Sequence, residues 1–185
     1  VFTSDHGYHL GEHGHWQKRT LFENSTRVPL IISGPGINKN QKIMDAPIEL
    51  VDIYPTLMEL VGMKTPEFVS GKSFASLLKD SSARVRESAL TELRYTLKDK
   101  SNVQGYSIKT DRYRLTKWGE KGDLGYELYD HKYDKEELNN LASNINYKTT
   151  RDSLIIVINK RIVQARKKPV GLGEQFEPIY MLGPE

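Results

Sequence analysis

The chain has 185 residues, of which 37% are hydrophobic and 28% are charged, a composition typical of a folded globular protein. Its net charge is only +3, and its Lys and Arg residues form no stripe with interleaved aromatic residues, which argues against a nucleic-acid partner. No apolar run approaches the roughly 20 residues that cross a bilayer, so we expect no membrane span. The absence of cysteine excludes disulfides and thiolate metal sites.

The first residue, Val1, lies inside an apolar run and is not an initiator Met. Because a protein rarely begins in the middle of a strand, we expect this sequence to be a piece of a longer protein. Residues 1–3 predict the end of a strand, and the glycine-rich stretch to about Gly14 predicts a loop. A short helix is expected over about 16–24. The run 28–33 lacks alternation, which predicts a strand buried on both faces.

The clearest helix signal covers residues 45–62. Asp52 is a suitable N-terminal cap, and Pro55 falls in the first turn, where its missing N–H costs little. Apolar residues then recur on one face, and Gly62 is well placed to end the helix. Three shorter elements are expected before residue 98: a turn with a short amphipathic helix over 71–78, a charged linker over 79–86 and a strand over 88–93.

After about residue 98 the sequence alternates between polar and apolar residues. Segments 104–109 and 112–118 predict a β-hairpin with one face in water, and segment 126–130 predicts a third antiparallel strand. Apolar residues at three- and four-residue spacing then predict a helix over about 149–168. The other predictions here are a short helix opening at 134–137 and an irregular tail from Pro169.

Charged and polar side chains gather where the first strand meets its loop. Such a junction is a common ligand site in α/β proteins, and Asp5 and His6 can both reach one cation if the loop departs from strand alternation, as Gly7 permits. Alternatively, Asp5 caps the loop backbone and His6 is a hydrogen-bonded polar residue. Lys18 offers a compact positive charge for an anionic substrate group, or is a solvated surface residue.

Three further histidines follow, at positions His9, His13 and His15. Their alternating spacing through glycines matches no compact zinc pattern, so we do not assign them a zinc ion. The triplet Asn24-Ser25-Thr26 has the form of a glycosylation sequon, a match that arises often by chance.

Several motifs follow one another along the chain in a recognisable order. They are Ser4-Asp5-His6-Gly7, Leu10-Gly11-Glu12-His13-Gly14, Trp16, Lys18, Val28-Pro29-Leu30-Ile31, Gly34-Pro35-Gly36, Leu50 to Leu57, Gly105 to Thr110, Tyr113-Arg114, Glu127 to Asp130 and Asn140-Leu141. This order resembles the sulfatase family over positions 1 to about 142. The Asp-His pair and the Gly-Tyr-Ser-Ile segment are most similar to the branch that includes iduronate-2-sulfatase.

The resemblance implies the C-terminal part of an alkaline-phosphatase-like α/β enzyme that hydrolyses sulfate esters, such as those of a sulfated sugar or glycosaminoglycan. Residues 1–97 would belong to the main α/β domain, and 98–185 would form a subdomain of antiparallel sheet and C-terminal helix. In the family a formylglycine is the nucleophile and a Ca²⁺ ion polarises the sulfate oxygens. By resemblance, Asp5 and His6 would bind that ion, and Lys18 would contact the sulfate or the bridging oxygen.

This chain departs from the family pattern in two respects. Many sulfatases have Asp-Asn where this chain has Asp5-His6, and because calcium prefers oxygen ligands, His6 would bind the ion weakly or lie near a substrate oxygen. The nucleophile motif and the first Asp-Asp metal pair are both absent from this sequence. We therefore expect activity only when the chain is joined to an N-terminal sulfatase segment, and no sulfatase activity from these residues alone.

Two other functions remain open from the sequence. One is a phosphodiesterase or phosphonate hydrolase of the same superfamily, and the other is a non-catalytic binding domain that keeps the fold. Residues Gly105-Tyr106-Ser107 either pack a hairpin strand or contact substrate, and the basic run 161–168 is either a solvated helix face or a site for an anionic glycan. The resemblance also implies an extracytoplasmic location, whether secreted, periplasmic or lysosomal.

Overall fold

The computed structural model describes residues 1–35, 37, 45–97, 99 and 101–170. The elements are β1 (Phe2–Thr3), η1 (Glu12–Gly14), α1 (Glu23–Thr26), β2 (Leu30–Ile31), η2 (Leu50–Asp52), α2 (Ile53–Leu60), β3 (Ala89–Thr96), β4 (Asn102–Lys109), β5 (Tyr113–Trp118), β6 (Gly125–Asp130), η3 (Ile145–Tyr147) and α3 (Lys148–Ala165). Within these ranges, no helix combines the length and apolar character that a bilayer crossing requires. The expected irregular tail lies mostly outside the described residues.

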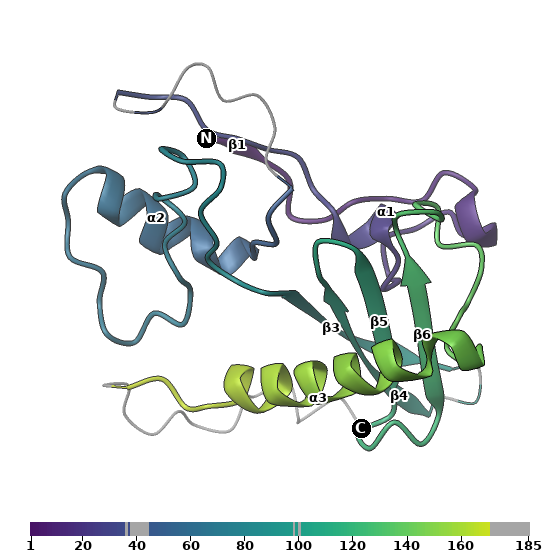
Figure 1. Ribbon diagram of the computed structural model, residues 1–185. Coiled ribbons are helices and arrows are strands. Elements are labelled where there is room, and N and C mark those ends of the chain that lie inside the picture. Colours follow the sequence, from purple (N-terminus) through teal and green to yellow (C-terminus); the bar gives the residue numbers. More distant parts are fainter. Residues whose placement is uncertain (36, 38–44, 98, 100, 171–185) are drawn as a thin grey trace.

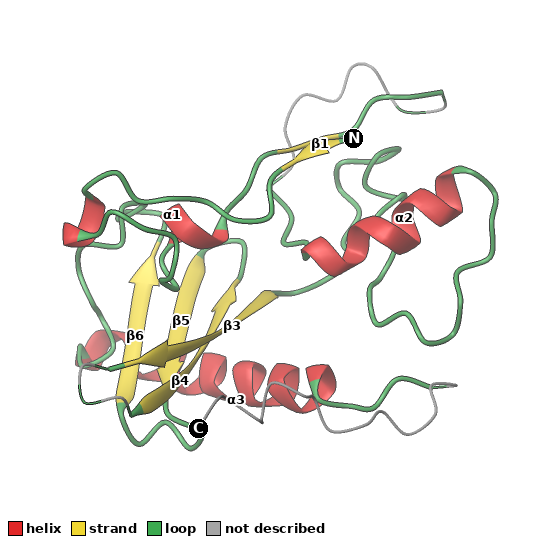
Figure 2. Ribbon diagram, turned by 180° about the vertical axis from the view of Figure 1, so that it is seen from behind, coloured by secondary structure: helices red, strands yellow, loops and turns green. Residues whose placement is uncertain are grey.

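A four-stranded antiparallel sheet in the order β3-β4-β5-β6 forms the C-terminal part, and α3 packs along one of its faces (Figures 1 and 2). The predicted hairpin, third strand and long helix are therefore confirmed. Alternation along the strands sends one set of apolar side chains toward α3, whose own stripe meets them. The buried core consists of Tyr106, Ile108, Leu115, Leu128, Ala142, Leu154, Ile158 and Ile162.

The opposite face of the hairpin is also buried, which corrects the expectation of a wet face. Ser107, Arg114 and Thr116 point away from α3 and are at most 2% exposed. Leu21 covers this face closely, because a Cβ built at Gly105 would lie 2.7 Å from its Cδ1 atom. The segment around α1 therefore lies over a polar sheet face, and the polar side chains there must find partners within the protein.

The N-terminal part is less regular. β1 and β2 form a two-residue antiparallel pair, in which Phe2 lies opposite Ile31. The predicted strand 28–33 is shorter than expected, and it is not buried on both faces: Ile31 is 60% exposed, whereas Leu30 packs inward. A second apolar cluster, built on buried Phe74, Leu77 and Leu78, joins β2 to α2.

The helix predicted over 45–62 begins later, at η2, and continues as α2. Its N-terminal cap is Glu49 and not Asp52, because the two residues form a capping box in which the Asp52 carboxylate accepts the Glu49 N–H at 2.9 Å. Pro55 does lie in the first turn of α2. Gly62 follows the end of α2 with a φ of +72°, as its expected role in ending the helix requires.

Three other helix predictions are wrong in extent or in kind. Residues 16–22 are not helical, because the carbonyl of Gln17 instead accepts the N–H of His9 at 3.0 Å; the helix here is the four-residue α1. Segment 71–78 forms turns, and its apolar residues enter the second cluster without a helix. Segment 134–137 is also a turn, since Glu137 adopts a left-handed φ of +56° that no right-handed helix accepts.

The predicted linker 79–86 is exposed for most of its length but ends in a buried side chain. Arg86 is 8% exposed, and its Nε donates to Asp52 at 2.6 Å. It also pairs with Glu49 at 3.2 Å, and Glu49 in turn pairs with Arg161 of α3. This ion-pair network joins the second cluster to the helix that covers the sheet.

The strand predicted over 88–93 is confirmed and is longer, as β3. All of β3 pairs with β4, so the C-terminal sheet begins at Ala89, ahead of the expected division between 1–97 and 98–185. That division into two domains stays a prediction.

Candidate functional site

The loop after β1 is pressed against α1. The Gly7 N–H donates to the carbonyl of Ser25 at 2.9 Å, and a Cβ at Gly7 would lie 1.9 Å from the carbonyl oxygen of Asn24. Only glycine allows two backbones to approach this closely. The position of Asp5 and His6 therefore depends directly on the backbone of α1.

Asp5, His6 and Lys18 come together at this loop. The His6 Nδ1 lies 2.7 Å from the Gly7 carbonyl, to which it donates, so Nε2 carries the lone pair in a neutral ring. Lys18 Nζ lies 2.8 Å from that Nε2, and an Asp5 carboxylate oxygen lies 3.6 Å from it. The Asp5 side chain is 84% exposed. The functional roles of the three residues stay predictions.

These groups fit part of a divalent-cation site. A ring whose Nδ1–H is held by a carbonyl presents Nε2 in a fixed direction, as metal-binding histidines do. Lys18 Nζ occupies that nitrogen in this structure, so the lysine side chain would have to move aside for a cation to bind. The Asp5 carboxylate adds an anionic oxygen on the same side. Calcium takes about six to eight ligands, mostly oxygens, so Asp5 and His6 would supply a fraction of its shell.

Two other histidines of the loop, His9 and His13, make contacts away from Asp5 and His6. His9 is fully buried, with Nδ1 3.1 Å from the Glu12 carbonyl and Nε2 2.7 Å from Thr20 Oγ1. Burial lowers the pKa of His9, which favours the neutral ring. His13 stacks on Phe22, with ring centroids 3.9 Å apart. His9 and His13 thus hold the shape of the loop between Asp5 and Lys18.

A second cluster with metal-like composition consists of Glu23, His131 and Glu137, whose ligand atoms lie within 4.8 Å of one another. Arg114 already occupies the space between the carboxylates: its Nε donates to Glu137 at 2.5 Å, and its Nη2 pairs with Glu23. His131 Nε2 approaches the same Glu137 oxygen at 2.7 Å. Since protein donors satisfy these oxygens, the cluster is an ion-pair network and offers no open position to a cation.

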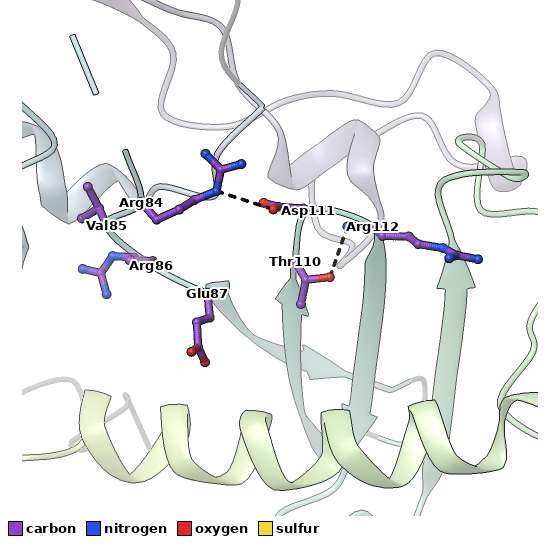
Figure 3. A pocket seen from close by; sticks show the side chains of 7 residues that line it. All are labelled: Arg84, Val85, Arg86, Glu87, Thr110, Asp111 and Arg112. Carbon is purple, nitrogen blue, oxygen red and sulfur yellow. Dashed lines mark hydrogen bonds and ion pairs between the residues drawn. The ribbon is translucent and has the colours of Figure 1, made fainter. Parts of the chain in front are cut away.

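A hollow of about 510 Å³ lies between the segment that leads into β3 and the turn between β4 and β5 (Figure 3). Three arginines line it, but each is paired: Arg84 with Asp111, Arg86 with Asp52, and Arg112 with Asp130. None of Asp5, His6 and Lys18 lines it. Its arginines are therefore all paired, and it contains none of the three candidate residues.

Two segments with open interpretations now have a structural role. Tyr106 and Ser107 are fully buried in β4, which supports packing over substrate contact. Burial also raises the pKa of Tyr106, whose hydroxyl donates to Glu120 at 2.7 Å. In the basic run, Arg161 pairs with Glu49 and Arg166 pairs with Glu120, so only part of that run is a solvated face.

The sequence did not indicate the residues that hold the loop and α1 in place. Thr20 contacts His9, Ser25 accepts from Gly7, and Glu137 accepts the Glu23 N–H at 2.8 Å. Glu137 is 114 positions from Glu23, and no local pattern indicates such a pairing. The acidic run around Glu137 instead suggested the first turn of a helix.

The fold is that of an α/β protein of the alkaline-phosphatase-like class, to which sulfatases belong. A solved complex of a protein with its substrate D-glucosamine-2-N,6-O-disulfate resembles this chain with a TM-score of 0.77 and 27% identity, over 92% of this chain and 35% of that one. A solved structure described as a 2-O GAG sulfatase resembles this chain with a TM-score of 0.78 and 26% identity, over 95% of this chain and 38% of that one. The fold is also shared with a phosphonate monoester hydrolase of Agrobacterium radiobacter, with a TM-score of 0.74 and 24% identity over 95% of this chain and 37% of that one.

Residues 11–168 match the family model described as N-sulphoglucosamine sulphohydrolase, C-terminal. The chain belongs to this sulfatase family. It is 34% identical to a sulfatase of Formosa agariphila over 160 residues, which cover 86% of this chain and 29% of that protein. It is 31% identical to mouse arylsulfatase K over 147 residues, or 77% of this chain and 26% of that enzyme. The chain thus spans less than a third of these relatives.

Proposed function

We propose that this chain is one part of a sulfatase that hydrolyses sulfate esters, and that it supplies the Asp5, His6 and Lys18 side of the active site. The observation that carries the proposal is the convergence of these three side chains at the end of β1, in a member of the sulfatase family. A longer protein that includes this chain would supply the nucleophile, a formylglycine, and further metal ligands.

The three residues have distinct roles in this proposal. Asp5 would hold a Ca²⁺ ion through its carboxylate, and the bound ion would polarise the sulfate oxygens. With its Nδ1–H fixed by the Gly7 carbonyl, His6 would present the lone pair of Nε2 to the same ion, or would donate an Nε2–H to a substrate oxygen in the imidazolium form. Lys18 would place its ammonium at the oxygen where negative charge develops as the ester bond breaks.

The proposed substrate is a sulfated carbohydrate. The support is a structural neighbour at 27% identity whose bound substrate is a glucosamine disulfate. A glycosaminoglycan sulfate of the kind cleaved in the iduronate-2-sulfatase branch is the narrower proposal. The curated relatives include arylsulfatase K from several vertebrates, so they support the family and leave the branch open. An extracytoplasmic location belongs to the same proposal.

The test compares a sulfate ester and a phosphate ester of one leaving group, using the full-length protein that contains this chain. We expect faster turnover of the sulfate, and loss of activity in Asp5→Ala together with weaker Ca²⁺ binding. Faster phosphate turnover would instead favour a phosphodiesterase or phosphonate hydrolase. A protein that hydrolyses neither ester, or an Asp5→Ala variant with normal activity and metal content, would contradict the proposal.

A further inference from the structure

The site loop packs directly against α1. Gly7 donates its N–H to Ser25 of α1 and abuts the carbonyl of Asn24. Ser25 Oγ also lies 2.9 Å from Thr20 Oγ1, which contacts His9. A shift of α1 would therefore move the backbone that carries Asp5 and His6.

The helix α1 has only four residues, so its own hydrogen bonds do not fix its place. Two side chains from the C-terminal part hold it at both ends. At its start, Glu137 accepts the Glu23 N–H at 2.8 Å. At its end, Arg114 of β5 donates to Thr26 Oγ1 at 3.0 Å, while the same guanidinium pairs with Glu23.

Arg114 and Glu137 form one buried unit. Arg114 Nε donates to Glu137 at 2.5 Å, and both side chains are at most 2% exposed. Arg114 also donates to Ser107 Oγ at 3.1 Å, which fixes the guanidinium against β4. The unit is therefore attached to the sheet on one side and to α1 on the other.

The unusual backbone conformation of Glu137 is evidence that the position of its carboxylate matters. A φ of +56° is unusual for a residue other than glycine and is energetically unfavourable. Such a conformation persists where surrounding contacts impose it. In this backbone conformation the carboxylate of Glu137 lies between Arg114, His131 and the start of α1.

We propose that Glu137 and Arg114 are positioning residues for the Asp5, His6 and Lys18 site, and that they act through α1 and the contact of α1 with Gly7. Their effect on cation binding and turnover rests on the proposed sulfatase function. Their effect on the geometry of the loop does not depend on that function. Arg114 and Glu137 contact α1, and neither side chain contacts Asp5 or His6.

The experiment compares Glu137→Gln with Glu49→Gln in the full-length protein. Both changes remove a carboxylate that pairs with arginine, fully buried at Glu137 and 13% exposed at Glu49. The Glu49 network joins η2, β3 and α3 and does not contact α1. Five quantities are measured: the unfolding midpoint, hydrogen exchange of the segment that contains Gly7, Ca²⁺ affinity, and kcat and KM on a sulfate ester.

We expect both variants to lower the unfolding midpoint. Only Glu137→Gln should speed exchange at Gly7 and weaken Ca²⁺ affinity. We expect about a tenfold loss of affinity, the lower end of the loss seen when a direct partner of a metal ligand is removed, because Glu137 acts through α1. Normal exchange at Gly7 in folded Glu137→Gln, or equal changes in Glu49→Gln, would overturn the proposal. If Glu137→Gln does not fold, Glu23→Gln removes the α1 end of the same network and is judged by the same criteria.

Failure of the sulfatase proposal would be visible separately. A wild-type protein without Ca²⁺ binding or sulfate-ester hydrolysis would contradict the proposed function. A comparison of the hydrogen-exchange rate at Gly7 between Glu137→Gln and Glu49→Gln would still decide whether Glu137 positions the loop.

Discussion

The C-terminal sheet and the N-terminal site loop are held by different interactions. The sheet has strands of six to eight residues and an 18-residue helix over a continuous apolar core. The loop has a two-residue strand and a four-residue helix, with its shape fixed by carbonyl, hydroxyl and imidazole contacts. Figures 1 and 2 show the contrast between the regular and the irregular part.

Because of this difference, the stability of the fold and the geometry of the loop depend on different residues. Burial of apolar area stabilises the sheet and depends little on the exact position of any one atom. The loop depends on individual contacts such as the approach of Gly7 to α1, each with a small net free energy but a strict geometry. Mutations in the two regions should therefore produce different kinds of change.

The largest expected effect on stability comes from Leu115→Ala in the sheet core. Leu115 is fully buried between the sheet and α3, so the change should lower the free energy of unfolding by about 2–5 kcal/mol. Denaturant unfolding measures it, with Leu124→Ala, at 59% exposed, as the control. A smaller decrease in the free energy of unfolding than that of Leu124→Ala would show that this core is not the main source of stability.

Lys18→Ala should change turnover without changing the fold. In the full-length enzyme we expect kcat for a sulfate ester to fall by about 10²–10³, as for removal of one group that stabilises transition-state charge. The exposed Lys18 contributes little to packing, so the unfolding midpoint and Ca²⁺ content should stay near those of the wild type. Loss of the metal or of the fold would show a structural role.

Gly7→Ala should disturb the loop while leaving the sheet intact. The added Cβ overlaps the Asn24 carbonyl, which should cost about 1–3 kcal/mol and displace Asp5 and His6. Gly34→Ala is the matched control, since its Cβ would meet Ile37 at an ordinary 3.8 Å. Hydrogen exchange of residues 4–7 should rise in the first variant alone, and equal exchange would contradict the close approach.

The smallest expected effect is a pH dependence from His9. Because burial lowers the folded-state pKa of His9 below its usual value of about 6.5, the unfolded loop binds the proton more readily below that pH. The contribution of His9 is therefore present above about pH 6.5 and is lost as the pH falls toward the folded-state pKa. The protection of segment 9–20 against hydrogen exchange, taken relative to the intrinsic amide rate at each pH, should fall between pH 7.5 and pH 5, and His9→Gln should reduce this fall.

The regular part of the fold was readable from the sequence, because periodicity reports burial directly. Alternation predicted β4 and β5, and apolar spacing predicted α3 to within a few residues. Periodicity does not report what covers the second face of a sheet. The burial of Ser107 and Arg114 beneath the α1 segment was therefore missed.

The site was predictable in part, for a different reason. The motif order indicated Asp5, His6 and Lys18, and the structure brings their side chains together. The supporting contacts were not predictable, because they depend on pairs distant in sequence and on backbone conformations without a local signal. The left-handed glutamate Glu137 is the clearest case, since nothing in an acidic run distinguishes it from the start of a helix.

The long sequence separation between Glu23 and Glu137 also has a consequence for the order of folding events. The pairs β3–β4, β4–β5 and β5–β6 are consecutive and close short loops, which form quickly. The contacts of α1 with Arg114 and Glu137 close loops of 91 and 114 residues, and they require the sheet as a template. We therefore expect the loop that carries Asp5 and His6 to be among the last parts of the chain to reach its final conformation.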